Sequence, residues 1–251
     1  MGPDLSFAHQ LADAADVITM GRYRALDLRV ETKPDLTPVT EADRATEEAL
    51  RTLVASSRPG EGVLGEEEGD DGGDVRWIVD PIDGTRNYVR GVPIWATLIA
   101  LEREGRVDAA VVSAPALGRR WWAARGDGAF AGDEGNRLRV SAVDRLDDAV
   151  VSTTEWHDMP PGWTRLASQA WVSRGFGDFW QHCLVAEGAV DLAAEPSLEI
   201  WDYSAVRLIV EEAGGRCSTF GGGPPAPSGS FLATNGALHE AGVALLGGQT
   251  P

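Results

Sequence analysis

The chain has 251 residues, of which 43% are hydrophobic and 24% charged, so it can bury the core of a globular protein. Its formal net charge of −17 argues against nucleic acid or an anionic membrane as a partner, and two cysteines are too few for a disulfide framework. Because the sequence shows neither a long apolar stretch nor a secretory signal, we expect a cytoplasmic protein without a membrane span.

The first predicted elements are two amphipathic helices separated by an irregular segment. Apolar residues at helical spacing predict a helix over residues 5–26. Two prolines within residues 32–38 exclude a regular helix there. Thr40 and Asp43 have the spacing of a capping box, which predicts that the second helix begins at this point. Asp43 therefore has a structural explanation, and an active-site role is the alternative.

A short strand and an acidic segment follow. Glycines frame a predicted strand over residues 60–65, which ends at Glu66, Glu67 and Glu68. Most of the acidic stretch that follows is typical of a solvated loop. We expect the Gly-rich and Asp-rich residues 69–74 to form a mobile loop that can cover the site.

The most informative stretch of the chain is the strand and turn over residues 77–87. Residues 77–79 predict a buried strand that delivers Asp80 and Asp83 to one edge. Pro81 interrupts strand pairing, and Gly84 permits a tight turn with exposed backbone N–H groups. Two carboxylates and a carbonyl suit a hard cation such as Mg2+, and the N–H groups suit a phosphate. An ordinary Asx-type turn is the alternative for Asp-x-x-Asp-Gly alone.

The remainder of the chain mixes strand pairs with helices, which predicts layered sheets and helices. Predicted strands cover residues 95–101 and 107–113 as a hairpin, and then 120–125, 138–140, 149–153, 190–194 and 231–234. Predicted helices cover residues 163–170, 179–189 and 201–213, and a last one follows Asn235.

Four motifs in this order resemble the signature of the inositol monophosphatase family of Mg2+-dependent phosphatases. The motifs are Pro-Val-Thr-Glu-Ala-Asp at 38–43, Gly-Glu-Glu at 65–67, Trp-Ile-Val-Asp-Pro-Ile-Asp-Gly-Thr at 77–85, and Trp-Asp-Tyr-Ser-Ala at 201–205 with Glu-Ala-Gly-Gly at 212–215. The resemblance implies an α+β fold, a layered α-β-α-β-α sandwich of the inositol monophosphatase and fructose-bisphosphatase type. It also implies one domain over residues 1–251 and a homodimer.

The same resemblance implies a metal and phosphate site in the first half of the chain. Two or three Mg2+ ions are expected, with the following ligands: Glu66, Asp80, the Ile82 carbonyl, Asp83 and Asp202. Thr85, paired with Asp43, is expected to orient and deprotonate the attacking water together with Glu66. The backbone N–H groups of Gly84 and Thr85 are expected to hold the phosphate oxygens, without a covalent phosphoenzyme.

The second half of the chain is expected to select the substrate. Arg-Gly-Phe-Gly-Asp at 174–178, together with residues 120–126, is similar to actinobacterial-type histidinol-phosphate phosphatases. This similarity implies that Asp178 and Glu195 bind the ammonium and imidazole groups of histidinol phosphate in histidine biosynthesis. The alternative for Asp178 is a helix N-cap before Phe179. The alternative functions are a broad inositol-1-monophosphatase and, more remotely, a non-catalytic metal-binding regulatory protein.

Overall fold

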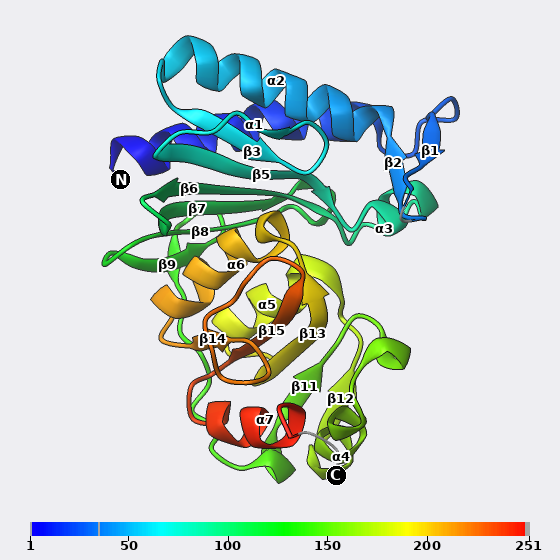
Figure 1. The fold of residues 1–251 in the computed structure, drawn as a ribbon, viewed down its shortest axis with the longest axis vertical. Coiled ribbons are helices and arrows are strands. Elements are labelled where there is room, and N and C mark those ends of the chain that lie inside the picture. Colours follow the sequence, from blue (N-terminus) through cyan, green and yellow to red (C-terminus); the bar gives the residue numbers. More distant parts are fainter. Residues whose placement is uncertain (1, 35, 249–251) are drawn as a thin grey trace.

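The structure is a computed structural model that describes residues 2–34 and 36–248. Its helices and sheets stack in five layers, visible from top to bottom in Figure 1. Helices α1 and α2 form the first layer, a large sheet the second, α5 and α6 the third, a smaller sheet the fourth, and α4 and α7 the fifth. The predicted α-β-α-β-α sandwich is therefore confirmed.

The first two layers come from the first half of the chain. Helices α1 (Pro3–Arg22) and α2 (Glu41–Ser57) cover one face of an eight-stranded sheet with the order β10-β9-β8-β7-β6-β5-β3-β4. Its neighbouring strands pair antiparallel except β3 and β5, which are parallel. The strands are β3 (Gly62–Gly65), β4 (Gly69–Asp70), β5 (Val75–Asp83), β6 (Ala96–Arg103), β7 (Arg106–Ala114), β8 (Arg119–Ala124), β9 (Gly128–Ala131) and β10 (Asn136–Arg137).

The other layers come mainly from the second half. A five-stranded sheet has the order β12-β11-β13-β15-β14, with strands β11 (Val150–Ser152), β12 (Val172–Arg174), β13 (Leu192–Leu198), β14 (Arg216–Ser218) and β15 (Gly229–Thr234). The helices are α4 (Pro161–Gln169), α5 (Asp178–Ala186), α6 (Ile200–Glu212) and α7 (His239–Leu246). The hairpin β1 (Val30–Thr32) and β2 (Pro38–Thr40) lies beside α3 (Thr85–Arg90) at one end of the first sheet (Figure 1). Short 3-10 turns cover Pro115–Leu117, Leu146–Asp148 and Trp156–Asp158.

The main apolar core links the two sheets through the central helices. One buried cluster contains Ile78 and Leu98 from the first sheet, Ile209 from α6 and Phe231 from the second sheet. Burying each such side chain contributes roughly 1.5–3 kcal/mol. The central helices therefore hold the strand ends of both sheets in fixed relative positions.

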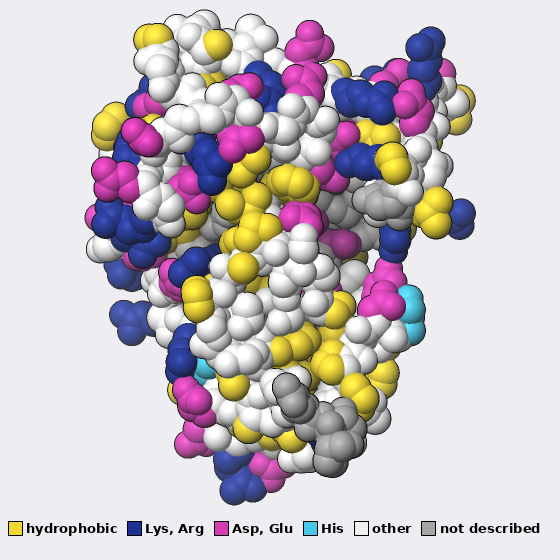
Figure 2. All heavy atoms as spheres, in the orientation of Figure 1, with side chains coloured by type: hydrophobic (Ala, Val, Ile, Leu, Met, Phe, Trp, Pro, Cys, Tyr) yellow, Lys and Arg dark blue, Asp and Glu magenta, His cyan; other side chains and the backbone are white. Residues whose placement is uncertain are grey.

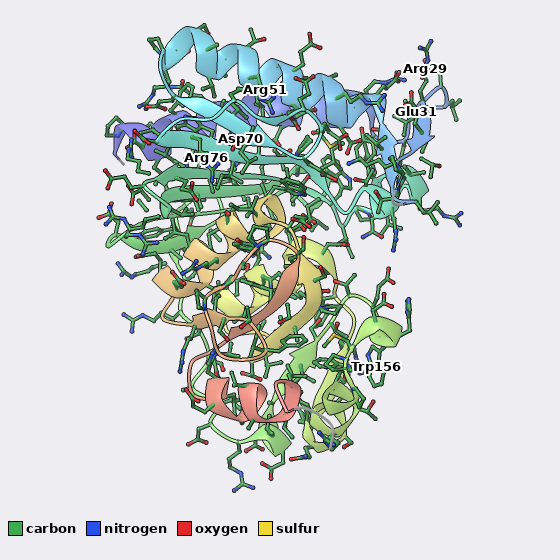
Figure 3. The ribbon with its side chains drawn as sticks, in the orientation of Figure 1. Arg29, Glu31, Arg51, Asp70, Arg76 and Trp156 are labelled. Carbon is green, nitrogen blue, oxygen red and sulfur yellow. The ribbon has the colours of Figure 1, made fainter. Side chains whose placement is uncertain are left out.

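Two sequence predictions are wrong in detail. Residues 138–140 are not a strand, because β10 ends at Arg137: the Leu138 N–H still donates to the Ala129 carbonyl of β9, but the Val140 N–H already donates to the Ala213 carbonyl in the next layer. Residues 69–74 are not wholly a loop, since Gly69 and Asp70 form strand β4. This edge is held by Arg76, which pairs with Asp70 at 2.6 Å, and by Arg51, which donates to the Gly69 carbonyl at 2.6 Å (Figure 3).

The surface carries charges of both signs. On the face shown in Figure 2, acidic and basic side chains lie next to one another. Many of these neighbours form ion pairs, such as that of Arg76 with Glu102 at 2.8 Å. No helix within residues 2–34 and 36–248 combines the length and the apolar character that a membrane span requires.

Candidate active site

The junction of β5 and α3 places two acids at the end of the first sheet. Strand β5 extends through both Asp80 and Asp83, and its pairing with β6 shifts register between them, where Pro81 has no N–H to donate. Gly84 follows with φ +84°, and a Cβ there would lie 3.0 Å from the Ile94 carbonyl oxygen. This position therefore favours glycine, as the predicted tight turn requires.

Three carboxylates converge at this junction. Oxygen atoms of Asp80, Asp83 and Asp202 lie within 4.8 Å of one another, although Asp202 comes from the first turn of α6. Asp202 is held there because its Oδ2 accepts the Glu199 N–H at 2.7 Å. Asp202 is 119 positions from Asp83 and 122 positions from Asp80 in the sequence, and the fold brings the three side chains together.

Among the residues that the structure describes, no basic side chain forms an ion pair with Asp80, Asp83 or Asp202 to balance their charge. Burial, followed by the negative charge of Glu66, raises the pKa of Asp80 well above its ordinary value. Burial also raises the pKa of Asp83, with Asp178 as the next cause, and that of Asp202 to about 7. Buried carboxylates that repel one another and offer hard oxygen ligands fit a divalent cation such as Mg2+.

Glu66 lines the cavity around these acids but does not belong to the cluster of Asp80, Asp83 and Asp202. Its Oε1 accepts a hydrogen bond from the Lys33 ammonium at 2.7 Å, and the same ammonium lies 2.5 Å from Glu67. A positive group therefore already occupies one oxygen of Glu66. Of the predicted metal ligands, Asp80, Asp83 and Asp202 meet closely, while Glu66 and Ile82 line the cavity around them.

Sequence reasoning missed Glu47, which supports the turn that carries Glu66. The carboxylate of Glu47 is fully buried, accepts the N–H groups of Glu67 and Glu68 at 2.8 and 2.9 Å, and pairs with Arg51 at 2.8 Å. A Cβ at Gly65 would lie 2.2 Å from Glu47 Oε1, so this strand end must be glycine for Glu47 to fit. The available signal was its place one helical turn after Asp43, on the same face of α2.

Asp43 forms the predicted cap of α2 and also contacts Thr85. Its Oδ2 accepts the Thr40 N–H at 2.8 Å and the Thr40 hydroxyl at 2.5 Å, which completes the predicted capping box of α2. Its Oδ1 accepts the Thr85 hydroxyl at 3.3 Å, and that hydroxyl also lies 2.9 Å from the Ile82 carbonyl oxygen. The cap therefore fixes a carboxylate that in turn holds a hydroxyl beside the acid cluster.

Two adjoining cavities surround these groups. The first cavity, of about 580 Å³, is lined by residues that include Glu66, Asp80, Ile82, Gly84 and Thr85. The second cavity, of about 480 Å³, is lined by residues that include Phe179, His182, Glu195 and Leu198. Asp83, Asp178 and Asp202 line both cavities. A ligand can therefore place one part at the acid cluster and another part in the second cavity.

Asp178 and Glu195, predicted to contact the substrate, both face the second cavity. The N-cap of α5 is Gly177, so the alternative of Asp178 as the cap is wrong. Asp178 instead has φ +47°, and its Oδ2 accepts the Asn87 side-chain N–H at 2.8 Å. Such a φ is unusual for a residue with a Cβ. Burial raises the pKa of Asp178 to about 6.

Glu195 lies on β13, and one of its two carboxylate oxygens already accepts hydrogen bonds from other residues of the protein. Its Oε1 accepts the Thr154 N–H at 3.0 Å, the Thr154 hydroxyl, and the Gln181 side-chain N–H. Burial raises the pKa of Glu195 to about 7. The carboxylate is therefore fixed in place, and its ionisation falls near neutral pH.

Comparisons with known proteins agree with this geometry. Residues 2–249 match the model of the inositol monophosphatase family. Histidinol-phosphatases of Mycobacterium tuberculosis and Streptomyces coelicolor are each 52% identical to this chain, over 94% of it and 95% and 94% of their own lengths. The structure of the IMPase of Thermotoga maritima is similar with a TM-score of 0.91 and 31% identity, covering 98% of this chain and 97% of that one.

Proposed function

The chain belongs to the inositol monophosphatase family, a family of metal-dependent enzymes, and on that premise we propose that it hydrolyses histidinol phosphate to histidinol and phosphate in histidine biosynthesis. It is a phosphoric monoester hydrolase. The observation that carries the choice of substrate is the second cavity, where Asp178 and Glu195 lie next to the metal site. Histidinol phosphate has an imidazole group and an ammonium group, and carboxylates bind an ammonium through charge-assisted hydrogen bonds.

The metal in this proposal is Mg2+, with two or three ions held by the acid cluster. The ligands would be Glu66, Asp80, the Ile82 carbonyl, Asp83 and Asp202. Bound there, the ions neutralise the phosphate and acidify a water molecule. The hard oxygen ligands and their unbalanced negative charge support this choice of metal.

The residues around the first cavity can direct the attack of water on phosphorus. The Thr85 hydroxyl, fixed by Asp43 and the Ile82 carbonyl, would orient the water, and Asp43 would receive a proton through it. Glu66, which lines the same cavity, would help to orient the water. The backbone N–H groups of Gly84 and Thr85 would bind phosphate oxygens. The reaction then needs no covalent phosphoenzyme.

The proposal also assigns different roles to the two halves of the chain. We propose that residues 1–251 act as one domain, in which the first half supplies the metal and phosphate site, apart from Asp202, and the second half supplies the specificity elements. The positions of Asp80 on β5 and Glu195 on β13 support this division. We also propose a cytoplasmic homodimer. The support for a homodimer is the family itself, whose members are commonly homodimers.

An inositol-1-monophosphatase of broad specificity is the second candidate, because the same metal site would serve either ester and the IMPase of Thermotoga maritima has this fold. The second cavity separates the candidates, since a neutral polyol would leave Asp178 and Glu195 without a cationic partner. A non-catalytic metal-binding protein is disfavoured by the complete set of acids around the first cavity.

Phosphate release tests the proposal. Histidinol phosphate, inositol 1-phosphate and glycerol 2-phosphate are each assayed with Mg2+ and with a chelator. We expect Mg2+-dependent hydrolysis, with kcat/KM for histidinol phosphate at least about tenfold above the other two, a difference of about 1.4 kcal/mol. Equal values for the three esters would favour the broad phosphatase, and no hydrolysis of any ester would favour the non-catalytic alternative.

A further inference from the structure

The inner wall of the second cavity carries a buried histidine to which no role has been assigned. His182 lies on α5 and lines the cavity with Phe179 and Leu198, and only 2% of its surface is exposed. Its ring packs edge-on against Phe231, with a centroid distance of 5.1 Å and an interplanar angle of 83°. The orientation of the imidazole is therefore fixed by packing.

The ring of His182 has no hydrogen-bond partner in the described parts of the protein. Its Nδ1 is buried without one, and neither ring nitrogen takes part in a hydrogen bond with residues 2–34 or 36–248. Most buried polar groups in folded proteins are hydrogen-bonded, and an exception calls for an explanation. Nδ1 itself has no surface open to the cavity, so Nε2 is the ring nitrogen that a ligand bound in the cavity can reach.

The chemistry of the wall restricts what this ligand can be. Burial lowers the pKa of His182 to about 3, so the ring is neutral at working pH, and its Nε2 either donates or accepts a single hydrogen bond, depending on the tautomer. Phe179 and Leu198 add apolar contact surface beside it. A flat ring that itself carries a donor and an acceptor matches this wall.

The rest of the second cavity is lined mainly by acidic side chains. Glu155, Asp158, Asp178 and Glu195 line it, and its single basic lining residue is Arg86 among the residues that the structure describes. Arg86 is already paired with Glu155. The carboxylates therefore suit an ammonium group, whereas the neutral His182 and its apolar neighbours suit an uncharged ring.

We propose that His182 hydrogen-bonds the imidazole ring of the substrate and is the residue that selects an imidazole-bearing phosphate ester. The inference rests on the proposed histidinol-phosphatase function and adds a residue and an orientation to it. The substrate's ring lies against His182, Phe179 and Leu198, its ammonium faces Asp178 and Glu195, and its phosphate reaches the acid cluster in the first cavity.

Two substitutions test this assignment. H182L removes both ring nitrogens while keeping an apolar side chain, and H182Q keeps a donor and an acceptor. The substrates are histidinol phosphate, phosphoethanolamine, which has the ammonium without a ring, and glycerol 2-phosphate, which has neither. H239Q is the matched control, because His239 is equally buried but lies on α7 and contacts Thr234 instead of the cavity.

We expect H182L to lower kcat/KM for histidinol phosphate by about tenfold or more, mainly through KM, since a site built to hydrogen-bond a ligand loses that contact. The values for phosphoethanolamine and glycerol 2-phosphate should change by less than about twofold. H182Q should lose less than H182L, and H239Q should show no substrate-dependent change. A proportional loss for all three substrates in H182L, or no loss for histidinol phosphate, overturns the assignment.

A binding measurement on the unmodified protein covers the case in which the variants do not fold. Calorimetry compares histidinol with phenylalaninol, which keeps the ammonium and a flat ring but has no ring nitrogen. We expect histidinol to bind at least about tenfold more tightly, and equal affinities refute the role of His182. If the unmodified enzyme does not prefer histidinol phosphate over glycerol 2-phosphate, the proposed function itself fails.

Discussion

Replacing Asp83 by asparagine removes a negative charge from the acid cluster and leaves the size of the side chain almost unchanged. Asp83 Oδ2 accepts the Phe179 N–H at 2.6 Å, and the amide oxygen of asparagine can accept the same hydrogen bond. The variant D83N therefore keeps the contact between β5 and α5. It removes one of three carboxylates whose oxygens lie within 4.8 Å of one another.

The distances set the size of the effect on stability. Two unit charges at 4.8 Å, the upper limit of the separations in this cluster, repel by about 3.5 kcal/mol at an effective dielectric constant of about 20. Asp83 belongs to two of the three pairs, and protonation already relieves part of the repulsion, because the pKa values of these acids are raised. We expect metal-free D83N to exceed the unmodified protein in free energy of unfolding by roughly 1–3 kcal/mol at neutral pH.

The dependence on pH has a definite sign. Burial raises the pKa of Asp83 in the folded state well above the ordinary value of an aspartate, so the folded state binds more protons than the unfolded state. The stability contributed by the protonated carboxyl is complete below about pH 4 and is lost as the pH rises through the folded pKa. The advantage of D83N in a chelator should therefore be small near pH 4 and grow towards pH 8.

Thermal melts in a chelator and in Mg2+, together with phosphate release, form the assay. We expect D83N to melt a few degrees higher than the unmodified protein in the chelator, to gain little from Mg2+, and to lose at least about 100-fold in kcat/KM. D133N is the control, since Asp133 is exposed. Near-normal activity of D83N, or a lower melting temperature than the unmodified protein in the chelator, would refute the assignment of a metal ligand.

Three further predictions concern the supporting residues. E47Q should weaken Mg2+ binding by about 10–100-fold in calorimetry, because each oxygen of Glu47 accepts one of the Glu67 and Glu68 N–H groups and glutamine replaces one of these oxygens by an NH2 donor; unchanged affinity would contradict the role of Glu47. G65A should lower the melting temperature by the equivalent of about 1–3 kcal/mol, since its Cβ would lie 2.2 Å from Glu47 Oε1, whereas G21A, with open space around its Cβ, should not. The kcat/KM for histidinol phosphate should rise as Glu195 ionises around pH 7, and E195Q should lose that rise; an identical pH profile in both proteins would contradict the proposed contact with the ammonium.

The parts of the fold that depend on residues close together in the sequence could be predicted from local motifs. The capping box of Thr40 and Asp43 begins α2 as expected, because both of its hydrogen bonds form within four residues. The register shift at Pro81 follows from its missing N–H, and the turn at Gly84 follows from its positive φ. The layered sandwich was predicted from the resemblance to a family, and the comparison with solved structures confirms it.

Interactions between distant segments were not visible in the sequence. The end of the strand near residue 138 depends on the hydrogen bond of Val140 to Ala213, which only the packed α6 supplies. Lys33 meets Glu66 and Glu67 because the β1–β2 hairpin folds towards the first sheet. His182 has the spacing of an ordinary core residue of α5, and its place in the cavity wall follows from the neighbouring β13 and β15.

The net charge of −17 raises the question of how an anionic phosphate ester can bind at all. The basic side chains near the site are not available for it, because Lys33 is paired with Glu66 and Glu67 and Arg86 with Glu155. Arg86 is also the single basic residue that lines either cavity in the described parts of the chain. Attraction for the phosphate must then come from cations that the acid cluster binds. The same carboxylates that repel a free phosphate thus make its binding conditional on the metal, and a chelator should abolish binding of inorganic phosphate as well as turnover.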